Sequence, residues 1–191
     1  MIEKKGAGRP SNRDAILDAA DQLVAAEGAG HLTFDALSQT TGISKGGLLY
    51  HFKSKDCLLQ AMLKRRVERY EALREQYHHQ YADDPKGELK SILLAALDTD
   101  AECSRLGSGM LAAAATNPEL LGPLKEHVAL TLQRLERIAG SKVGKTLFYA
   151  VHGARLFEQL NLCDACVHER EDFAQYLLKL VDELTEIESI R

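Results

Sequence analysis

The amino-acid sequence predicts an all-α protein, with a small three-helix unit at the N-terminus and a larger helical unit after it. Three observations favour this fold class. Leu, Ala and Glu, all good helix formers, are the most frequent of the 191 residues, with only four prolines and no β-branched runs. Apolar residues recur at helical spacing along most of the chain. Polar caps, glycine and proline stand where these helices are expected to begin and end.

The first helix is expected to begin at Ser11 or Asn12, because either side chain can cap it. Gly28 suits a left-handed C-terminal cap, so the helix should end at residue 27. Ser54 is expected to cap a long helix that runs to about residue 80. One apolar stripe marks the buried face of the first helix: Ile16, Ala19, Ala20, Leu23 and Val24.

The segment Thr33–Lys55 predicts two short helices, capped by Thr33 and Ser44 and joined by a tight turn. Ser38 is small where the two helices meet, and Gly42 permits the positive φ of the turn. Leu48 is expected to anchor the second helix in the core. This spacing is typical of a helix-turn-helix, which lays its second helix in the major groove of double-stranded DNA.

Charge is distributed unevenly along the chain. The net charge of −4 by itself argues against a nucleic-acid partner. However, residues 1–66 carry 10 Lys and Arg against 7 Asp and Glu, whereas residues 67–191 carry 14 against 21. A basic end on an acidic body favours an approach of that end to phosphates, although an excess of this size also arises by chance.

A series of short motifs between residues 8 and 63 resembles the DNA-binding domain of the TetR family of transcriptional regulators. The resemblance covers about a third of the chain, and the rest matches only the family's general layout. It implies a homodimer, most often a repressor, that binds a palindromic operator and is released by a small-molecule inducer. The motifs are Ile16-Leu17-x-Ala19-Ala20, Gly28 with Leu32-Thr33, Gly42-Ile43-Ser44-Lys45-Gly46, Leu48 with Tyr50-His51-Phe52, and Ser54-Lys55.

The resemblance also implies the domain organisation and the DNA-contacting residues. We expect a flexible basic tail over residues 1–10, a helix-turn-helix DNA-binding domain over 11–53, and a ligand-binding and dimerisation domain over 54–191. Lys45 can donate to a guanine edge, while the N-termini of helices favour phosphates. The expected DNA contacts are Arg9, Thr33, Ser44, Lys45, Gly46, Gly47, Tyr50, His51 and Lys55.

Alternatives remain open for two of these residues. Tyr50 can instead pack against the first helix, and His51 can be a surface histidine without a partner. Two positions depart from the family pattern: Gly47 stands where threonine is common and Leu49 where an aromatic residue is common. Both changes remove a hydrogen-bonding side chain, so we expect base readout to depend on few side chains and on DNA shape.

The C-terminal two-thirds predicts further helices over about residues 84–99, 101–115, 117–139, 142–161 and 169–188. The last two are expected to pair with their symmetry mates in a four-helix dimer interface. The alternative is that they pack inside one protomer. The stripes expected at the interface are Val143, Leu147, Ala150, Ala154 and Phe157, then Phe173, Tyr176, Leu177, Leu180 and Leu184.

A ligand cavity is expected among these helices. The run from Gly109 to Pro118 is rich in small side chains, which can leave space unfilled, although alanine-rich helices often pack tightly. Aromatic and polar side chains elsewhere can complete the wall. The expected lining is Tyr70, Met110, Ala113, Phe148, Tyr149, His152 and Arg155.

The cysteines suggest an alternative way of sensing. Cys163 and Cys166 form a CxxC motif near His168, which invites a thiol- or metal-responsive regulator on the same scaffold. Two cysteines and one histidine fall short of a tetrahedral zinc site, so no metal and no cofactor are expected. Cys57 and Cys103 are expected to be buried.

Other classes of protein find little support in the sequence. No apolar run reaches the length of about 18 residues that a membrane helix needs, and the N-terminus lacks the apolar core of a signal peptide. A cytoplasmic protein without a membrane partner is therefore expected. No catalytic constellation stands out, so we expect no enzyme.

Overall fold

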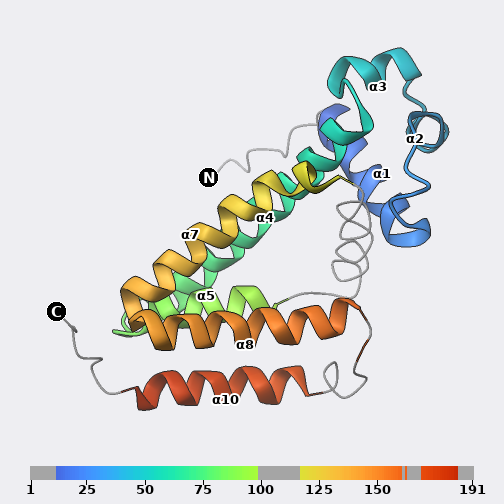
Figure 1. Cartoon of the computed structure of the whole chain (residues 1–191). Coiled ribbons are helices and arrows are strands. Elements are labelled where there is room, and N and C mark those ends of the chain that lie inside the picture. The colour runs from blue at the N-terminus through green and yellow to red at the C-terminus, as the bar shows by residue number, and fades with distance from the viewer. Residues whose placement is uncertain (1–11, 99–116, 161, 163–168, 185–191) are drawn as a thin grey trace, which may run out of the picture.

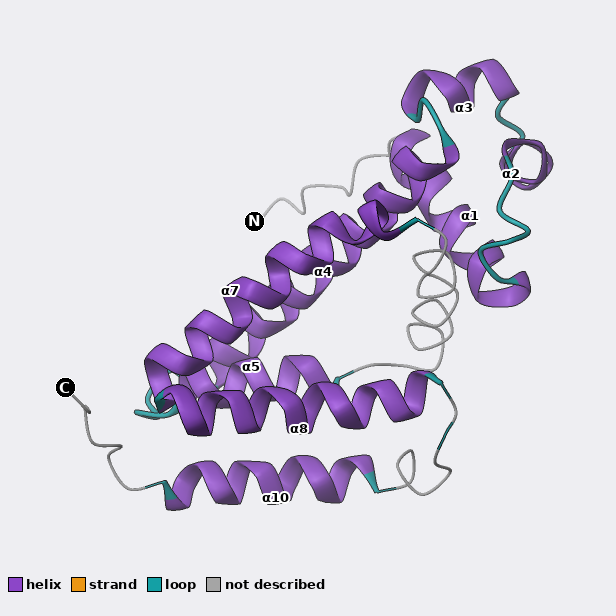
Figure 2. Cartoon of the chain, in the orientation of Figure 1, coloured by secondary structure: helices purple, strands orange, loops and turns teal. Residues whose placement is uncertain are grey.

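The structure, a computed structural model, describes residues 12–98, 117–160, 162 and 169–184. Every regular element in these ranges is a helix, which confirms the predicted fold class (Figure 2). The elements are α1 (Asn12–Glu27), α2 (Phe34–Thr41), α3 (Lys45–His51), α4 (Lys55–Gln80), α5 (Gly87–Leu97), the 3-10 helix η1 (Pro118–Leu121), α7 (Gly122–Ala139), α8 (Ser141–Gln159) and α10 (Arg170–Glu183).

The helices form a head and a body (Figure 1). Helices α1 to α3 gather at one end as the head. Helices α4 and α7 run side by side away from it, and α5, α8 and α10 lie at the far end. Helix α4 is one continuous helix of 26 residues that contributes to both parts, so it connects the head to the body.

The head has its own apolar core. Buried side chains of α1, α2 and α3 meet the first turns of α4, and burying each large aliphatic side chain contributes about 1.5–3 kcal/mol. The fully buried members include Ile16, Leu17, Val24, Leu37, Leu48, Leu58 and Met62.

The predicted caps of α2, α3 and α4 are confirmed. The hydroxyls of Thr33, Ser44 and Ser54 each accept a hydrogen bond from the backbone N–H three residues later, at 3.1, 3.2 and 3.1 Å. Gly42 ends α2 with a φ of 70°, and its N–H donates to the carbonyl of Ser38 at 2.9 Å. Local hydrogen bonds therefore set both ends of the turn between α2 and α3.

The helices of the body begin less regularly than expected. Helix α5 starts at Gly87 rather than near residue 84, because the Asp84 carboxylate and carbonyl accept hydrogen bonds from Lys86 and Gly87 and hold a turn. The helix expected from residue 117 begins as the 3-10 turn η1, with the Asn117 side chain accepting from Glu119. The helix expected over residues 101–115 lies outside the described residues.

The stripes expected at a dimer interface are divided between two faces. Leu147 and Leu177 are buried in the protomer's own core, which corrects the expectation that they face a symmetry mate. The reason is that α8 packs on α5 and α7 while α10 packs on α5, so one side of each helix is already used. Phe157 and Tyr176, by contrast, are 51% and 59% exposed.

Cys57 is exposed, so the expectation that it is buried is wrong. It stands in the first turn of α4, where Leu58 and Leu59 take the positions that face the core. Cys103, Cys163 and Cys166 lie outside the described residues. Within the described ranges, no helix combines the length and apolar character needed to cross a membrane.

Candidate functional site

Helix α3 separates an outer face from an inner face. Ser44, Lys45 and Gly46 are exposed at its N-terminus, whereas Leu48 and Phe52 are buried beneath it. In Figure 1 the helix lies at the outer end of the head, away from the body. The structure therefore brings three of the expected base-contacting residues together on one accessible surface.

Lys45 is held by an ion pair across the turn. Its Nζ donates to both carboxylate oxygens of Asp35 on α2, at 2.9 and 3.0 Å. The Lys45 and Asp35 side chains are 56% and 72% exposed, and pairs of this kind contribute only about 0–1 kcal/mol. A base edge can therefore replace the carboxylate at little cost.

The two glycines of α3 have different surroundings. A Cβ on Gly46 would have no heavy atom within 4 Å, so Gly46 leaves open space at the outer face. A Cβ on Gly47 would lie 2.9 Å from the Ile43 side chain. Gly47 thus serves the packing of the turn, a role that the sequence reasoning missed.

The other expected DNA contacts surround α3. Tyr50 is 78% exposed, so it does not pack against α1. The His51 ring contacts the Tyr50 ring edge to face, with 5.4 Å between the two ring centroids. Lys55 is at the N-terminus of α4 and donates to the Gly30 carbonyl at 3.4 Å. The Thr33 hydroxyl is already engaged as the cap of α2. Arg9 lies outside the described residues.

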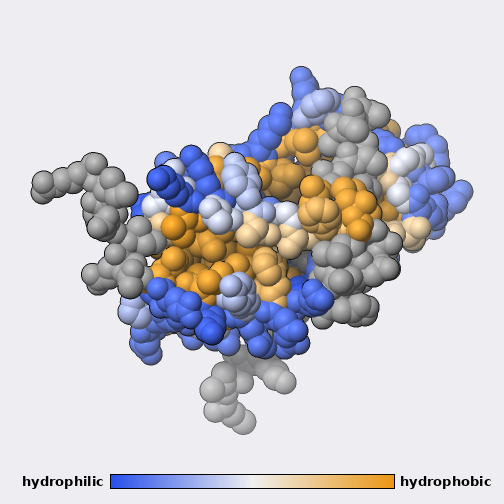
Figure 3. Space-filling view, turned by 60° about the horizontal axis from the view of Figure 1, so that its bottom comes forward, coloured by the Kyte–Doolittle hydropathy of each residue, from blue (hydrophilic) through white to orange (hydrophobic). Residues whose placement is uncertain are grey.

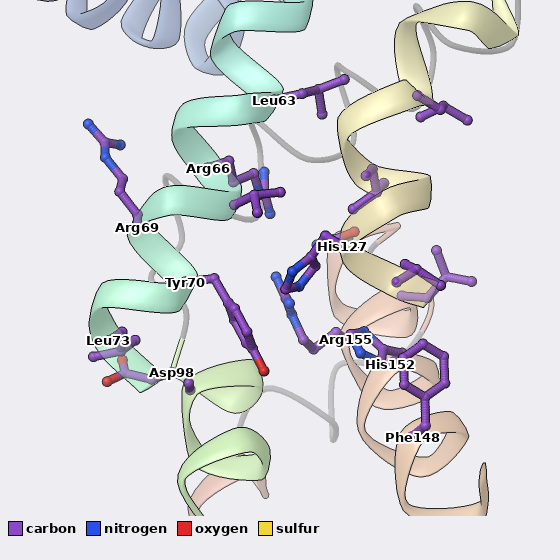
Figure 4. Close-up of a pocket in the computed structure, with 17 residues that line it drawn as sticks. Leu63, Arg66, Arg69, Tyr70, Leu73, Asp98, His127, Phe148, His152 and Arg155 are labelled. Atoms are coloured by element: carbon purple, nitrogen blue, oxygen red, sulfur yellow. The ribbon is translucent and has the colours of Figure 1, made fainter. Parts of the chain in front are cut away.

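A cavity of about 400 Å³ opens in the body, lined by α4, α7 and α8 with contributions from α5 and η1. Figure 4 shows Tyr70 of α4 and His127 of α7 pointing toward each other, with Arg155 of α8 extending into the same space. Apolar side chains cover much of the remaining wall, among them Leu63, Val67, Leu73, Leu124, Val128 and Phe148.

Four of the seven residues expected at a ligand cavity lie at this one: Tyr70, Phe148, His152 and Arg155. Tyr149 does not line it. An α-helix turns by about 100° per residue, so the neighbour of Phe148 points outward and is 64% exposed. Met110 and Ala113 lie outside the described residues.

The sequence reasoning missed Arg66, Arg69 and His127 at the cavity. Charged residues on a long helix are usually solvated, so the residue type of Arg66 and Arg69 did not indicate a cavity. Their position along the helix did indicate one. Leu63, Val67 and Tyr70 recur at helical intervals along α4, and the arginines stand beside this stripe.

Burial keeps Tyr70, His127 and His152 of the cavity neutral. It raises the pKa of Tyr70, whose hydroxyl donates to the Ile92 carbonyl at 3.2 Å. Burial, aided by the positive charge of Arg155, lowers the pKa of His152 to about 4. Burial also lowers the pKa of His127, against the attraction of Glu71. Both histidines are therefore uncharged near neutral pH.

Glu71 lies beside the cavity wall, and its carboxylate accepts hydrogen bonds from two arginines. Burial favours its protonated form, but hydrogen bonds from Arg74 and Arg134 outweigh that effect and lower its pKa. Arg134 donates to both carboxylate oxygens at 3.0 Å, and His127 Nδ1 lies 3.6 Å away. The carboxylate's charge is thus compensated within the protein.

A cluster of ion pairs joins the cavity to the head. Arg65 of α4 donates to Asp18 of α1 at 2.6 Å and also to Asp21. Arg69, one turn further along α4, lies 3.5 Å from the Asp21 carboxylate and at the same time lines the cavity. Burial raises the pKa of Asp21 despite the attraction of Arg65. The described residues contain no group of three or more side chains placed to hold a metal ion.

Comparison with protein families identifies two matching regions. The family model described as "Bacterial regulatory proteins, tetR family" matches residues 16–62. The model described as "Tetracyclin repressor-like, C-terminal domain" matches residues 86–182, which is half of the chain. The first region contains the helix-turn-helix, and the second contains α5, α7, α8 and most of α10.

Curated relatives match over shorter stretches. A region of 66 residues, 35% of this chain, is 33% identical to the HTH-type transcriptional regulator SrpR of Pseudomonas putida and covers 31% of it. A region of 99 residues, 52% of this chain, is 24% identical to the HTH-type transcriptional regulator AcrR of Shigella flexneri and covers 46% of it. The chain thus spans less than half the length of these two relatives.

Solved structures match over nearly the whole chain. The multidrug binding protein EbrR, complexed with malachite green, has a TM-score of 0.70 at 24% identity and covers 90% of this chain and 98% of its own. A TetR-family member from Streptomyces coelicolor A3 has a TM-score of 0.71 at 23% identity, with the same coverages. At these identities the likeness shows the shared fold.

Proposed function

The chain belongs to the TetR family of transcriptional regulators, and we propose that it is a repressor that binds a palindromic operator as a homodimer. In this proposal a small molecule in the body cavity releases the DNA. The family is non-enzymatic, in agreement with the absence of a catalytic pattern in the sequence. Binding to an operator also favours the expected cytoplasmic location.

The outer face of α3 supports DNA reading by few side chains. Lys45 directly precedes the exposed Gly46, and its partner among the described residues is the exposed carboxylate of Asp35. Tyr50, His51 and Lys55 surround it as phosphate-directed donors. We propose that DNA shape supplies much of the remaining specificity. Steep losses at many positions of each half-site, measured by base-by-base operator substitution, would contradict this view.

The exposed apolar side of α8 and α10 supports the homodimer. Tyr149 and Phe157 of α8, Leu160 at its C-cap and Tyr176 of α10 are all exposed by at least 45%. Figure 3 shows hydrophobic side chains gathered between hydrophilic bands on the side where these helices lie. Phe157→Glu should yield a monomer in sedimentation, while Leu130→Glu on α7, also at an exposed site, should leave the dimer intact.

The contacts of Arg69 are the observation that supports the proposed release of DNA. Arg69 is part of the cavity wall on α4, while its guanidinium points away from the cavity (Figure 4) and reaches Asp21 of α1, so a ligand that shifts this part of α4 also acts on the contact with the head. A ligand can shift the position of the head only through contacts that differ between two states. The contact between Arg69 and α1 is such a contact. The solved complex of EbrR with malachite green supports a small molecule as the effector.

The test begins with duplexes selected by the purified protein from a random library. The selected sites should be palindromic, with half-sites about one helical turn or slightly more apart. Compounds that release the duplex from the wild type, measured by fluorescence anisotropy, should release Arg69→Met at least about tenfold less effectively. Arg137→Met, a matched change at an exposed arginine of α7, should respond as the wild type does.

Non-palindromic selected sites, or an Arg69→Met variant with an unchanged response, would contradict the proposal. The alternative sensor using Cys163 and Cys166 has a separate test. The Cys163→Ser, Cys166→Ser double variant should keep its response to the small molecule. If the double variant loses that response, the protein senses its effector through the thiols or a metal bound by them, and not through the cavity.

A further inference from the structure

We propose that the cavity selects an apolar molecule that carries one negative charge, a medium-chain carboxylate or its chemical equivalent, and that Arg66 receives the charged end. This inference rests on the proposed function, because it names the class of effector for the same cavity. It differs from what the EbrR complexes suggest, since malachite green and ethidium are cations.

The charges that line the cavity favour an anion. Arg66, Arg69 and Arg155 are at the wall, and Asp98 is the carboxylate among the described lining residues. Asp98 is exposed at the end of α5, and the Tyr77 hydroxyl donates to it at 2.8 Å. Among the described lining residues, cationic side chains therefore outnumber the carboxylate, which favours an anion over a cation.

Arg66 has unused donor capacity at this wall. Its Nη1 atom is buried and has no hydrogen-bond partner among the described residues. Its neighbour Arg65 is paired with Asp18 and Asp21, so those carboxylates are already engaged. A buried cationic donor without a partner is costly, and a bound carboxylate would satisfy it with a charge-assisted hydrogen bond.

The positive charge of the cavity persists across the neutral pH range. The lining histidines are not its source, because burial lowers the pKa of both His127 and His152. Glu71, the acid next to the wall, is already compensated by Arg74 and Arg134. Anion preference should therefore not depend on histidine titration near pH 7.

The rest of the wall suits an apolar tail. Leu63, Val67 and Leu73 line one side from α4, and Leu124 and Val128 line the other from α7. A volume of about 400 Å³ lies within the common range for small-molecule sites. One charged end and a mainly apolar remainder define an amphipathic anion.

The test uses three probes with the same ten-carbon chain: decanoate, decanol and decyltrimethylammonium. Binding to the full chain without DNA is measured by calorimetry below the concentrations at which the probes aggregate. Decanoate should bind at least about tenfold tighter than decanol, because it gains a charge-assisted hydrogen bond, and the cation should bind most weakly. Equal binding of all three, preference for the cation, or no binding of any probe would overturn the inference.

Arg66→Met tests the assigned residue while keeping a long apolar side chain. It should reduce the preference for decanoate over decanol to within about twofold and leave decanol binding unchanged. Arg137→Met, at an exposed site away from the cavity, should keep the wild-type preference. An unchanged preference in Arg66→Met would overturn the assignment. If that variant does not fold, the three-probe series on the wild type still decides the anion preference.

Failure here is distinguishable from failure of the proposed function. Operator selection and dimerisation are measured without any of these probes. A protein that selects palindromic sites and is released by a cation would overturn the anion preference and keep the repressor. A protein that binds decanoate but selects no DNA would keep the anion preference and overturn the proposed repressor.

Discussion

The head and the body of this regulator begin their helices in different ways. In the head, the hydroxyls of Thr33, Ser44 and Ser54 cap α2, α3 and α4. In the body, α5, α7, α8 and α10 all begin without a side-chain cap hydrogen bond. The head is therefore specified largely by neighbours in the sequence, and the body by contacts between distant segments. In the proposed function the head reads DNA and the body responds to a ligand, and this difference suits both roles.

The close contact of α7 with α8 should give the largest effect on stability. A Cβ on Gly144 would lie 2.7 Å from the backbone of Leu135, and backbone cannot move aside cheaply. We expect Gly144→Ala to lower the free energy of unfolding by about 3 kcal/mol. Chemical denaturation measures this change. Gly122→Ala, with no atom within 4 Å of the added Cβ, is the control, and an equal loss there would refute the contact's role.

The second largest loss of stability is expected at Lys90 of α5, which forms ion pairs with the preceding turn and with α10. Lys90 is buried, and its Nζ donates to Asp84 at 2.6 Å and also pairs with Asp182 of α10. Lys90→Met should cost about 2 kcal/mol, because charge-assisted hydrogen bonds between distant segments are lost. The exposed Lys179, changed to Met, should cost less than about 0.5 kcal/mol. Equal costs in denaturant titrations would show that this contact between distant segments does not stabilise the body.

Acid should weaken the body through His152. Burial lowers the pKa of His152 to about 4 in the folded protein, against an ordinary histidine pKa of 6.5, so the unfolded chain binds the proton more readily. Stability is therefore lost as the pH falls from 6.5 toward 4. After allowance for solvent screening, we expect a loss of about 1–2 kcal/mol. His152→Gln should remove this part of the loss, and an unchanged pH profile of unfolding would show that His152 is not its source.

The caps of the head should give the smallest effects. Ser44→Ala removes the acceptor for the Gly47 N–H and should cost about 1 kcal/mol. Ser141 stands at the start of α8, but its hydroxyl donates to Glu136 and does not cap the helix. Ser141→Ala should therefore cost less than about 0.5 kcal/mol in thermal unfolding. Similar costs would mean that local capping does not distinguish the two parts.

The same difference explains how much was predictable from the sequence. The head was predictable nearly residue by residue, because caps, the turn glycine and the apolar stripe are local signals. The body was predictable as helices, but not in its contacts. Leu147 and Phe157 are both apolar on α8, yet one is buried in the protomer and the other is exposed. The apolar stripe of α4 marks the helix face beside which Arg66 and Arg69 stand, but their partners on α1 and α7 cannot be read from α4 alone.

The central claim is that the exposed start of α3 reads DNA through Lys45. The most direct measurement compares Lys45→Ala and Lys55→Ala on a selected operator and on versions with single base changes, across a range of salt. Lys45→Ala should lose about 1–3 kcal/mol of discrimination at one base pair per half-site, whereas Lys55→Ala should weaken all sequences alike and reduce the salt slope by about 1 per protomer. Wild-type affinity and discrimination in both variants would contradict the claim.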